Sequence, residues 1–218
     1  MRRLPLVVVC VTLLVLLASA NPLQAGSPPD ERRVAALLSP HPDIEKIRAL
    51  GPGVLPVLAS LYERAPEAQR PDIAWTFYEL GWPSDEAKRV LMKDAHTQNS
   101  DLRLQVQWAL GRVSNDADVV ATLVDTMRND GNPLFRDKAA CALAHDQIHL
   151  TEDQKYRLYA RLVDALRDDK LQVREIAAKA LQIQTGQTKS FDPAGSPEAR
   201  EAAIQEWMRW LDTYRSHL

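Results

Sequence analysis

An arginine recurs three times in one helical setting, and this recurrence limits the folds open to the chain more than any other feature. Arg103, Arg136 and Arg174 each follow an apolar residue and precede a run of apolar residues at helical spacing. The spacings between them are 33 and 38 residues. Self-similarity at such a period indicates stacked helix pairs, each of which needs its neighbours to bury its apolar face. The sequence therefore predicts an all-α solenoid.

The rest of the chain also favours helices. Gly and Pro stand between apolar-periodic stretches, and hardly any stretch alternates with a period of two residues. We expect an early series of helices, of which the first is capped by Asp30, a later one by Ser84, and the first arginine-bearing one by Ser100. Two later pairs share one plan: a helix over 116–128 precedes the Arg136 helix, and one over 152–167 precedes the Arg174 helix.

A second detail accompanies the arginines. Asp130 lies six residues before Arg136, and Asp168 lies six residues before Arg174. The order of apolar helix, Asp, apolar residue, Arg and alanine run resembles the HEAT repeat, most closely over residues 162–181 and in weaker form from residue 43 to residue 185. The resemblance implies a HEAT-like α–α superhelix in which acidic and arginine side chains form a ladder between repeats. The expected ladder residues are Asp130, Arg136, Asp168, Arg174 and Arg103, although Thr97 takes the place of the acid before Arg103.

We expect residues 186–218 to form a closing loop and a capping helix. A Thr-Gly-Gln turn at 185–187, a Phe-Asp-Pro step at 191–193 and a Trp-x-x-Trp helix together resemble the closing segment of bacterial HEAT-type proteins. Trp207 and Trp210 fall on one stripe of that helix, so they are expected to cover the apolar flank that a terminal repeat exposes. Ligand binding by these two side chains is the alternative.

The first residues are typical of an export signal. Two arginines precede an apolar run over residues 4–18, and cleavage is acceptable after Ala20 or after Ala25. We therefore expect a signal peptide over residues 1–25, a linker with a first short helix over 26–42, and an exported mature protein, periplasmic or secreted, without membrane insertion. An uncleaved membrane anchor is the alternative, but the run is shorter than the roughly 20 residues that a membrane helix needs.

Charge and cysteine content restrict the partners and the source of stability. Removal of Arg2 and Arg3 leaves 25 of the 27 Lys and Arg residues against 29 Asp and Glu, a net charge of −4. Such a chain has no basic field to attract nucleic acid, so we expect no nucleic-acid partner. Cleavage would also remove Cys10 and leave Cys141 alone, so stability is expected to come from packing and not from a disulfide.

The sequence contains no pattern that predicts catalysis. His145 and His149 are four residues apart, as in a zinc-protease helix, but the acid between them is Asp and they stand at a helix end. A surface turn is the better interpretation. There is no Gly-rich phosphate loop and no nucleophile elbow. We therefore expect a chain that is not an enzyme, with no catalytic residue, no cofactor and no bound metal.

The remaining candidates for function are surface side chains. Trp108 and Lys179 fall in one register, away from the apolar stripe of the arginine-bearing helices, and Trp75 has a similar place on the preceding helix. In HEAT stacks such second helices line the concave face. Aromatic residues dominate interface energetics, so Trp75, Trp108 and Lys179 are the candidates for contact with an unidentified protein partner. For Trp75 and Trp108, packing between adjacent repeats is the favoured interpretation and partner contact the alternative.

The sequence thus predicts a non-catalytic module for protein–protein interaction or scaffolding outside the cytoplasm. Two other functions stay open. One is an enzyme or chromophore-handling protein that uses the concave groove, since some HEAT-like proteins are bilin lyases. The other is a membrane-tethered adaptor that keeps its N-terminal segment as an anchor.

Overall fold

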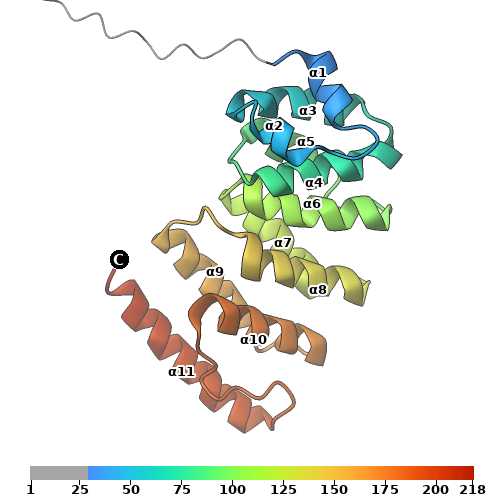
Figure 1. Cartoon of the computed structure of the whole chain (residues 1–218). Helices are drawn as coiled ribbons and strands as arrows, with labels where there is room; N and C mark the ends of the chain where they lie inside the picture. The colour runs from blue at the N-terminus through green and yellow to red at the C-terminus, as the bar shows by residue number, and fades with distance from the viewer. Residues whose placement is uncertain (1–28) are drawn as a thin grey trace, which may run out of the picture.

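The computed structural model describes residues 29–218, and this range consists of helices, turns and loops with no β-strand (Figure 1). The α-helices are α1 (Glu31–Leu37), α2 (Ile44–Arg48), α3 (Leu55–Arg64), α4 (Arg70–Leu80), α5 (Asp85–Lys93), α6 (Ser100–Val113), α7 (Ala117–Asn129), α8 (Pro133–Cys141), α9 (Glu152–Ala165), α10 (Leu171–Thr185) and α11 (Pro197–Arg215). The 3-10 turns η1 (Pro52–Val54) and η2 (Glu67–Gln69) precede α3 and α4, and a π-helical turn, η3 (Ala142–Asp146), follows α8. The signal peptide predicted over 1–25 lies outside the described residues.

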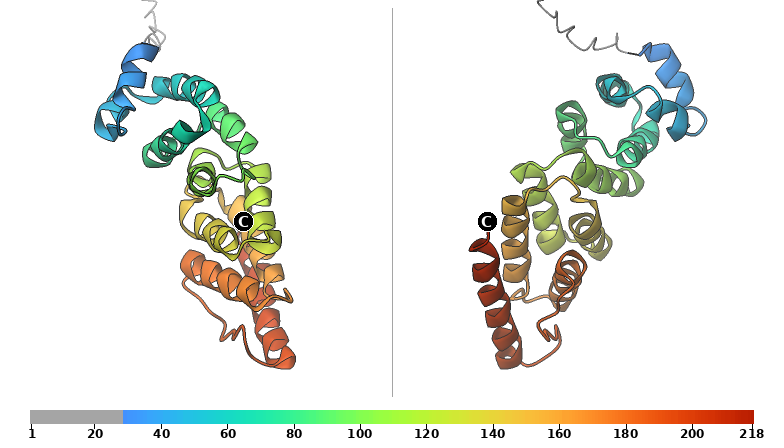
Figure 2. Two further views of the ribbon diagram at one scale, coloured as in Figure 1. Left: turned by 90° about the vertical axis from the view of Figure 1, so that its right-hand side faces the viewer. Right: turned by 60° about the vertical axis from the view of Figure 1, so that its left-hand side comes forward.

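The helices stack as successive pairs into a curved solenoid, which confirms the prediction of an all-α superhelix. Helices α4, α6, α8 and α10 lie in one row, each packed against the next (Figure 1). Helices α3, α5, α7 and α9 form a second row behind it, and the stack bends toward the first row (left view of Figure 2). We call the side presented by α4, α6, α8 and α10 the second-helix face.

Side-chain caps fix where several helices begin. An oxygen of the residue before the helix accepts a hydrogen bond from a first-turn backbone N–H at Asp30, Asp43, Ser84, Asn132, Thr151 and Ser196. The expected cap of α6 is wrong by one position, because Ser100 is the first helical residue and Asn99 is the cap. Asn99 Oδ1 accepts from the Leu102 N–H at 3.1 Å. Asn and Ser cap equally well, so the sequence could not separate two adjacent candidates.

One apolar core runs through the stack. Its members are the stripes that the sequence pattern predicts, and they include Phe77 of α4, Leu110 of α6, Leu143 of η3 and Leu181 of α10, all fully buried. Each stripe contacts the neighbouring pair, so no pair could keep its apolar surface from water alone. Stability is therefore shared along the chain, and the two ends need covers.

Helix α11 closes the C-terminal end of the stack. It packs along α9, and Trp207 is 1% exposed. Trp210 is half-buried, with its ring 5.7 Å from that of Tyr159 and 5.2 Å from that of Tyr214. The opposite side of α11 carries exposed polar residues such as Glu206 and Arg209. A terminal helix with one apolar and one polar side is what a solenoid needs at its end.

Replacement of Trp207 by alanine tests this cap. Because the indole is fully buried, Trp207→Ala is expected to lower the free energy of unfolding by about 3–5 kcal/mol. The neighbouring Met208 is 41% exposed, so Met208→Ala should change it by roughly 0.5 kcal/mol or less. Equilibrium urea unfolding followed by circular dichroism measures both. Equal effects of the two substitutions would mean that α11 does not cap the core.

Candidate functional site

The recurring arginines lie at the junctions between repeats. Arg136 donates from Nη1 to the carbonyl oxygen of Asp130 at 2.7 Å, and Arg174 donates from Nη1 to that of Asp168 at 2.9 Å. The acid six residues earlier is therefore contacted through its main chain and not through its carboxylate. A guanidinium with five donors can bind the carbonyls of the preceding turn and still reach further groups.

The remaining donors of these arginines reach across to the following repeat or closing loop. Arg103 forms an ion pair with the carboxylate of Asp130, and both side chains are largely buried. Arg136 Nε donates to Gln172 Oε1 at 2.9 Å, and Arg174 Nε donates to the Pro193 carbonyl at 2.8 Å. Arg136 and Arg174 therefore link the turn before their own helix to the element that follows. Arg103 links its helix to the acid of the next repeat.

The carboxylates of the two acids complete these junctions from the other side. Asp168 Oδ2 lies 3.4 Å from Arg128 Nε, while its Oδ1 accepts from the Lys170 N–H at 3.1 Å. Asp130 Oδ1 likewise accepts from the Asn132 N–H at 2.8 Å. The acids thus shape the turn between the two helices of a pair and bind an arginine of the preceding pair. These contacts are structural, because the carboxylates of both acids already accept from protein groups.

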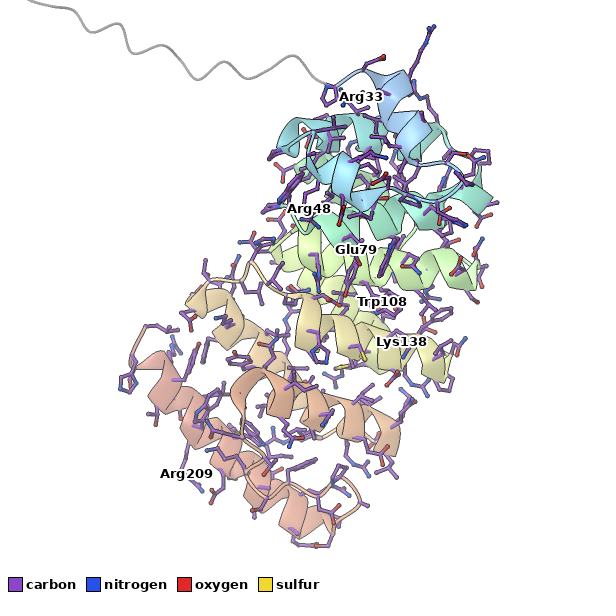
Figure 3. All side chains as sticks on the ribbon, viewed as in Figure 1. Arg33, Arg48, Glu79, Trp108, Lys138 and Arg209 are labelled. Carbon is purple, nitrogen blue, oxygen red and sulfur yellow. The ribbon has the colours of Figure 1, made fainter. Side chains whose placement is uncertain are left out.

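The second-helix face carries an aromatic cluster where α4 and α6 meet. The rings of Trp75 and Tyr78 stack with centroids 4.9 Å apart, and those of Tyr78 and Trp108 are 6.4 Å apart. All three side chains are half-buried, and Trp108 lies on the face turned toward the viewer in Figure 3. The sequence predicted Trp75 and Trp108 as candidate contact residues but missed Tyr78, although its spacing of three from Trp75 makes the two neighbours on a helix.

Arg112 and Asp146 hold this cluster in place. The Arg112 guanidinium lies 4.1 Å above the Tyr78 ring, Nη2 donates to the Tyr78 hydroxyl at 3.1 Å, and Nε donates to Asp146 Oδ1 at 3.1 Å. Asp146 is 4% exposed. Burial raises the pKa of its carboxyl above the usual range, and the hydrogen bond from Arg112 offsets this only in part. The arginine is thus fixed between an aromatic ring and a buried acid.

The burial of Asp146 corrects the sequence analysis, which predicted a surface turn at residues 145–149. Asp146 and Gln147 are buried, and His149 Nε2 lies 2.9 Å from the Gly81 carbonyl oxygen, two repeats earlier. Only His145 and Ile148 are exposed. The π-helical turn η3 adds a residue to the end of α8 and turns Asp146 inward, a change of register that helical spacing alone does not predict.

A second apolar feature lies further along the second-helix face. Cys141, Ile176 and Ile183 line a shallow depression of about 50 Å³ between α8 and α10, with Lys179 at its edge. Trp108, Cys141 and Lys179 occupy equivalent positions, because they are separated by the same 33 and 38 residues as the arginines. The structure therefore brings Trp75 and Trp108 together through Tyr78, while Lys179 lies further along the same face.

Cys141 and Lys179 are the polar or titratable candidates further along this face. Burial raises the pKa of the half-buried Cys141 thiol above its usual range, which favours the thiol over the thiolate. Lys179 is exposed and donates to Gln182 Oε1 at 3.3 Å. Within residues 29–218 no three His, Cys, Asp or Glu side chains are grouped as metal ligands. Helices in the same range are all too short or too polar to cross a membrane.

Comparisons with known proteins add little to this description. No protein-family model matches the chain, and no curated protein sequence matches it. Among solved structures it is similar to a designed armadillo repeat protein in complex with the peptide (KR)4. The two share 16% sequence identity with a TM-score of 0.46, over 82% of this chain and 80% of that chain. That protein is also built of helical repeats, but the likeness is too distant to carry a functional conclusion.

Replacement of Arg174 tests the junction contacts. Arg174→Ala removes three part-buried hydrogen bonds, to the carbonyl oxygens of Asp168, Asp169 and Pro193. We expect the free energy of unfolding to fall by about 1–3 kcal/mol. The matched control is Arg157→Ala, which breaks an exposed pair with Asp153 and should cost roughly 0.5 kcal/mol or less. Urea unfolding of both variants would refute the junction role if Arg174→Ala were as mild as the control.

Proposed function

We propose that the chain is an exported, non-catalytic protein-interaction module that binds a segment of another protein on its second-helix face. The aromatic cluster of Trp75, Tyr78 and Trp108 carries this proposal. Repeat packing does not require an aromatic residue at position 108, because the equivalent positions of the next two repeats hold Cys141 and Lys179. A half-buried tryptophan at a position where the next two repeats carry no aromatic residue is a good candidate for an interface anchor.

The arrangement around the cluster suits binding. The stack of Trp75, Tyr78 and Arg112 is held by the ion pair with Asp146, so the rings are already ordered and little side-chain entropy remains to be lost. An apolar centre bounded by polar residues is the usual composition of an interface. Here Lys138 of α8 lies on the same face (Figure 3).

The kind of partner follows from the series of apolar side chains on these helices. They are Trp75 on α4, Trp108 on α6, Cys141 on α8 and Ile183 on α10, all at least partly exposed. A segment that lies across four helices and presents apolar side chains at intervals would match this series. The two ends of the stack are poorer candidates, because α11 and α1 both turn charged residues outward.

We further propose that the repeats are of the HEAT type and that the module has no enzymatic activity. The pattern of Asp, apolar residue, Arg and alanine run supports the first point. For the second, the acid that reaches the aromatic cluster through Arg112 is Asp146, and its carboxylate is buried and paired with that arginine.

Export is proposed from the N-terminal residues alone, and the mass of the mature protein tests it. If the signal is cleaved, intact-mass and N-terminal analysis of protein recovered outside the cytoplasm should give a chain that begins at Asn21 or Gly26. A chain that keeps residues 1–20 and stays with the membrane fraction would favour the anchored adaptor instead.

Trp108→Ala tests the binding proposal. Peptides selected from a random display library on residues 29–218 should bind the Trp108→Ala variant about tenfold or more weakly, since loss of an aromatic anchor costs about 2 kcal/mol. Isothermal titration calorimetry measures both affinities. Met208→Ala is the control, because Met208 is an exposed apolar residue on α11, away from the second-helix face. Selected peptides that bind Trp108→Ala and the wild type equally would refute the proposal.

A further inference from the structure

The joint between the pairs α5/α6 and α7/α8 differs from the preceding one. Along α3 to α6, first helix packs on first helix and second on second, whereas α5 and α7 scarcely touch. On the outer side of the stack, which is the side of α3, α5, α7 and α9, a hollow of about 500 Å³ lies between α5 and the start of α7. The tie across it is Lys88, whose Nζ lies 2.5 Å from Asp116 Oδ2 and 2.8 Å from Asp118 Oδ2. The two acids are about half exposed, and exposed ion pairs contribute little to stability.

On the inner side, α6 packs against α8 and η3 through apolar residues, and the polar groups among them are not all satisfied. Arg103, Gln107 and Gly111 follow one another at a spacing of four along the side of α6 that meets α8 and η3. Gln107 is 1% exposed and Gln147 is 5% exposed, yet the amide nitrogen and oxygen of both side chains lack a hydrogen-bond partner among residues 29–218. Buried, unpaired amides favour a state in which water reaches them.

The following joint, between α8 and α10, shows the contrast. Gln184 of α10 donates from its amide nitrogen to the carbonyl oxygens of Leu143 and Ala144, at 3.2 and 2.8 Å. These are carbonyls of the π-helical turn η3. A glutamine thus stabilises that joint, whereas Gln107 and Gln147 weaken the joint before it.

We propose that the joint between α6 and α7 is a hinge about which residues 31–113 and 117–218 move as two bodies, with Ser114 to Asp116 as the connecting segment. The buried Arg103–Asp130 pair, with the guanidinium 4.1 Å above the Phe135 ring, is the pivot. A gap and an exposed tie between α5 and α7 on the outer side, with unpaired buried amides beside the inner contact, are the features of a low-energy opening.

Apolar packing of α6 against α8 and η3 also crosses the joint, and because it lies on the same inner side as the pivot it would form the axis of the motion. Two polar contacts cross the joint as well, the bond from Arg112 to Asp146 and the contact between His149 and Gly81, and these can exchange with water. Since Trp108 lies on α6 and Cys141 on α8, opening would change the spacing of side chains along the second-helix face. The hinge itself does not depend on any partner.

Distances between spin labels test the hinge. In a Cys141→Ser background, labels at Ala68→Cys and Ala202→Cys report across the joint, and labels at Ala117→Cys and Ala202→Cys report within the second body; all three alanines are exposed. Double electron–electron resonance should give a broader distance distribution for the first pair than for the second. Equal widths would overturn the proposal.

Two sets of substitutions then locate the cause. Gln107→Leu with Gln147→Leu removes the unpaired amides and should narrow the first distribution to the width of the second, while Gln184→Leu should not narrow it. Lys88→Ala removes the outer tie and should broaden it. If the double variant loses its circular dichroism signal, the Lys88→Ala result decides, and an unchanged width there would count against the hinge.

Discussion

The structure depends on one contact, the arginine near the start of a second helix. Arg136 and Arg174 each bind the carbonyls of the turn behind them and a group of the element ahead, and Arg103 binds the acid of the following repeat. Because an arginine presents several donors in a fixed plane, these bonds set the angle at which one pair follows the next. The curvature of the stack, and therefore the face that it presents, follows from that angle.

The fold could be predicted from the sequence because its signals are local. Helical spacing of apolar residues, prolines at helix starts and a repeated arginine require no knowledge of distant contacts. The details that were missed have non-local causes. The residues after Cys141 looked like a surface turn until the π-helical turn buried Asp146 against Arg112, 34 residues earlier. Likewise Tyr78 gains its role only because Trp75 and Arg112 lie on its two sides.

The aromatic cluster and the weak joint lie next to each other on α6. Trp108 and Arg112 belong to the aromatic cluster on the second-helix face, whereas Arg103 and Gln107 face the following repeat. One helix thus carries both the proposed anchor and one wall of the proposed hinge. A partner that spans α6 and α8 would bridge the joint. It would bind most tightly to the conformation whose opening angle matches the spacing of its own side chains. Whether binding opens or closes the joint depends on the partner, but the position of the joint depends only on this chain.

The most direct test of the account is the indole N–H spectrum of the chain, because its five tryptophans report on separate places. Trp75 and Trp108 lie on the second-helix face, Trp207 and Trp210 lie in the C-terminal cap, and Trp82 follows α4. Addition of a selected peptide to nitrogen-15-labelled protein should shift the signals of Trp75 and Trp108 and leave the two cap signals in place. Shifts confined to Trp207 and Trp210 would contradict the assignment of the second-helix face as the binding surface.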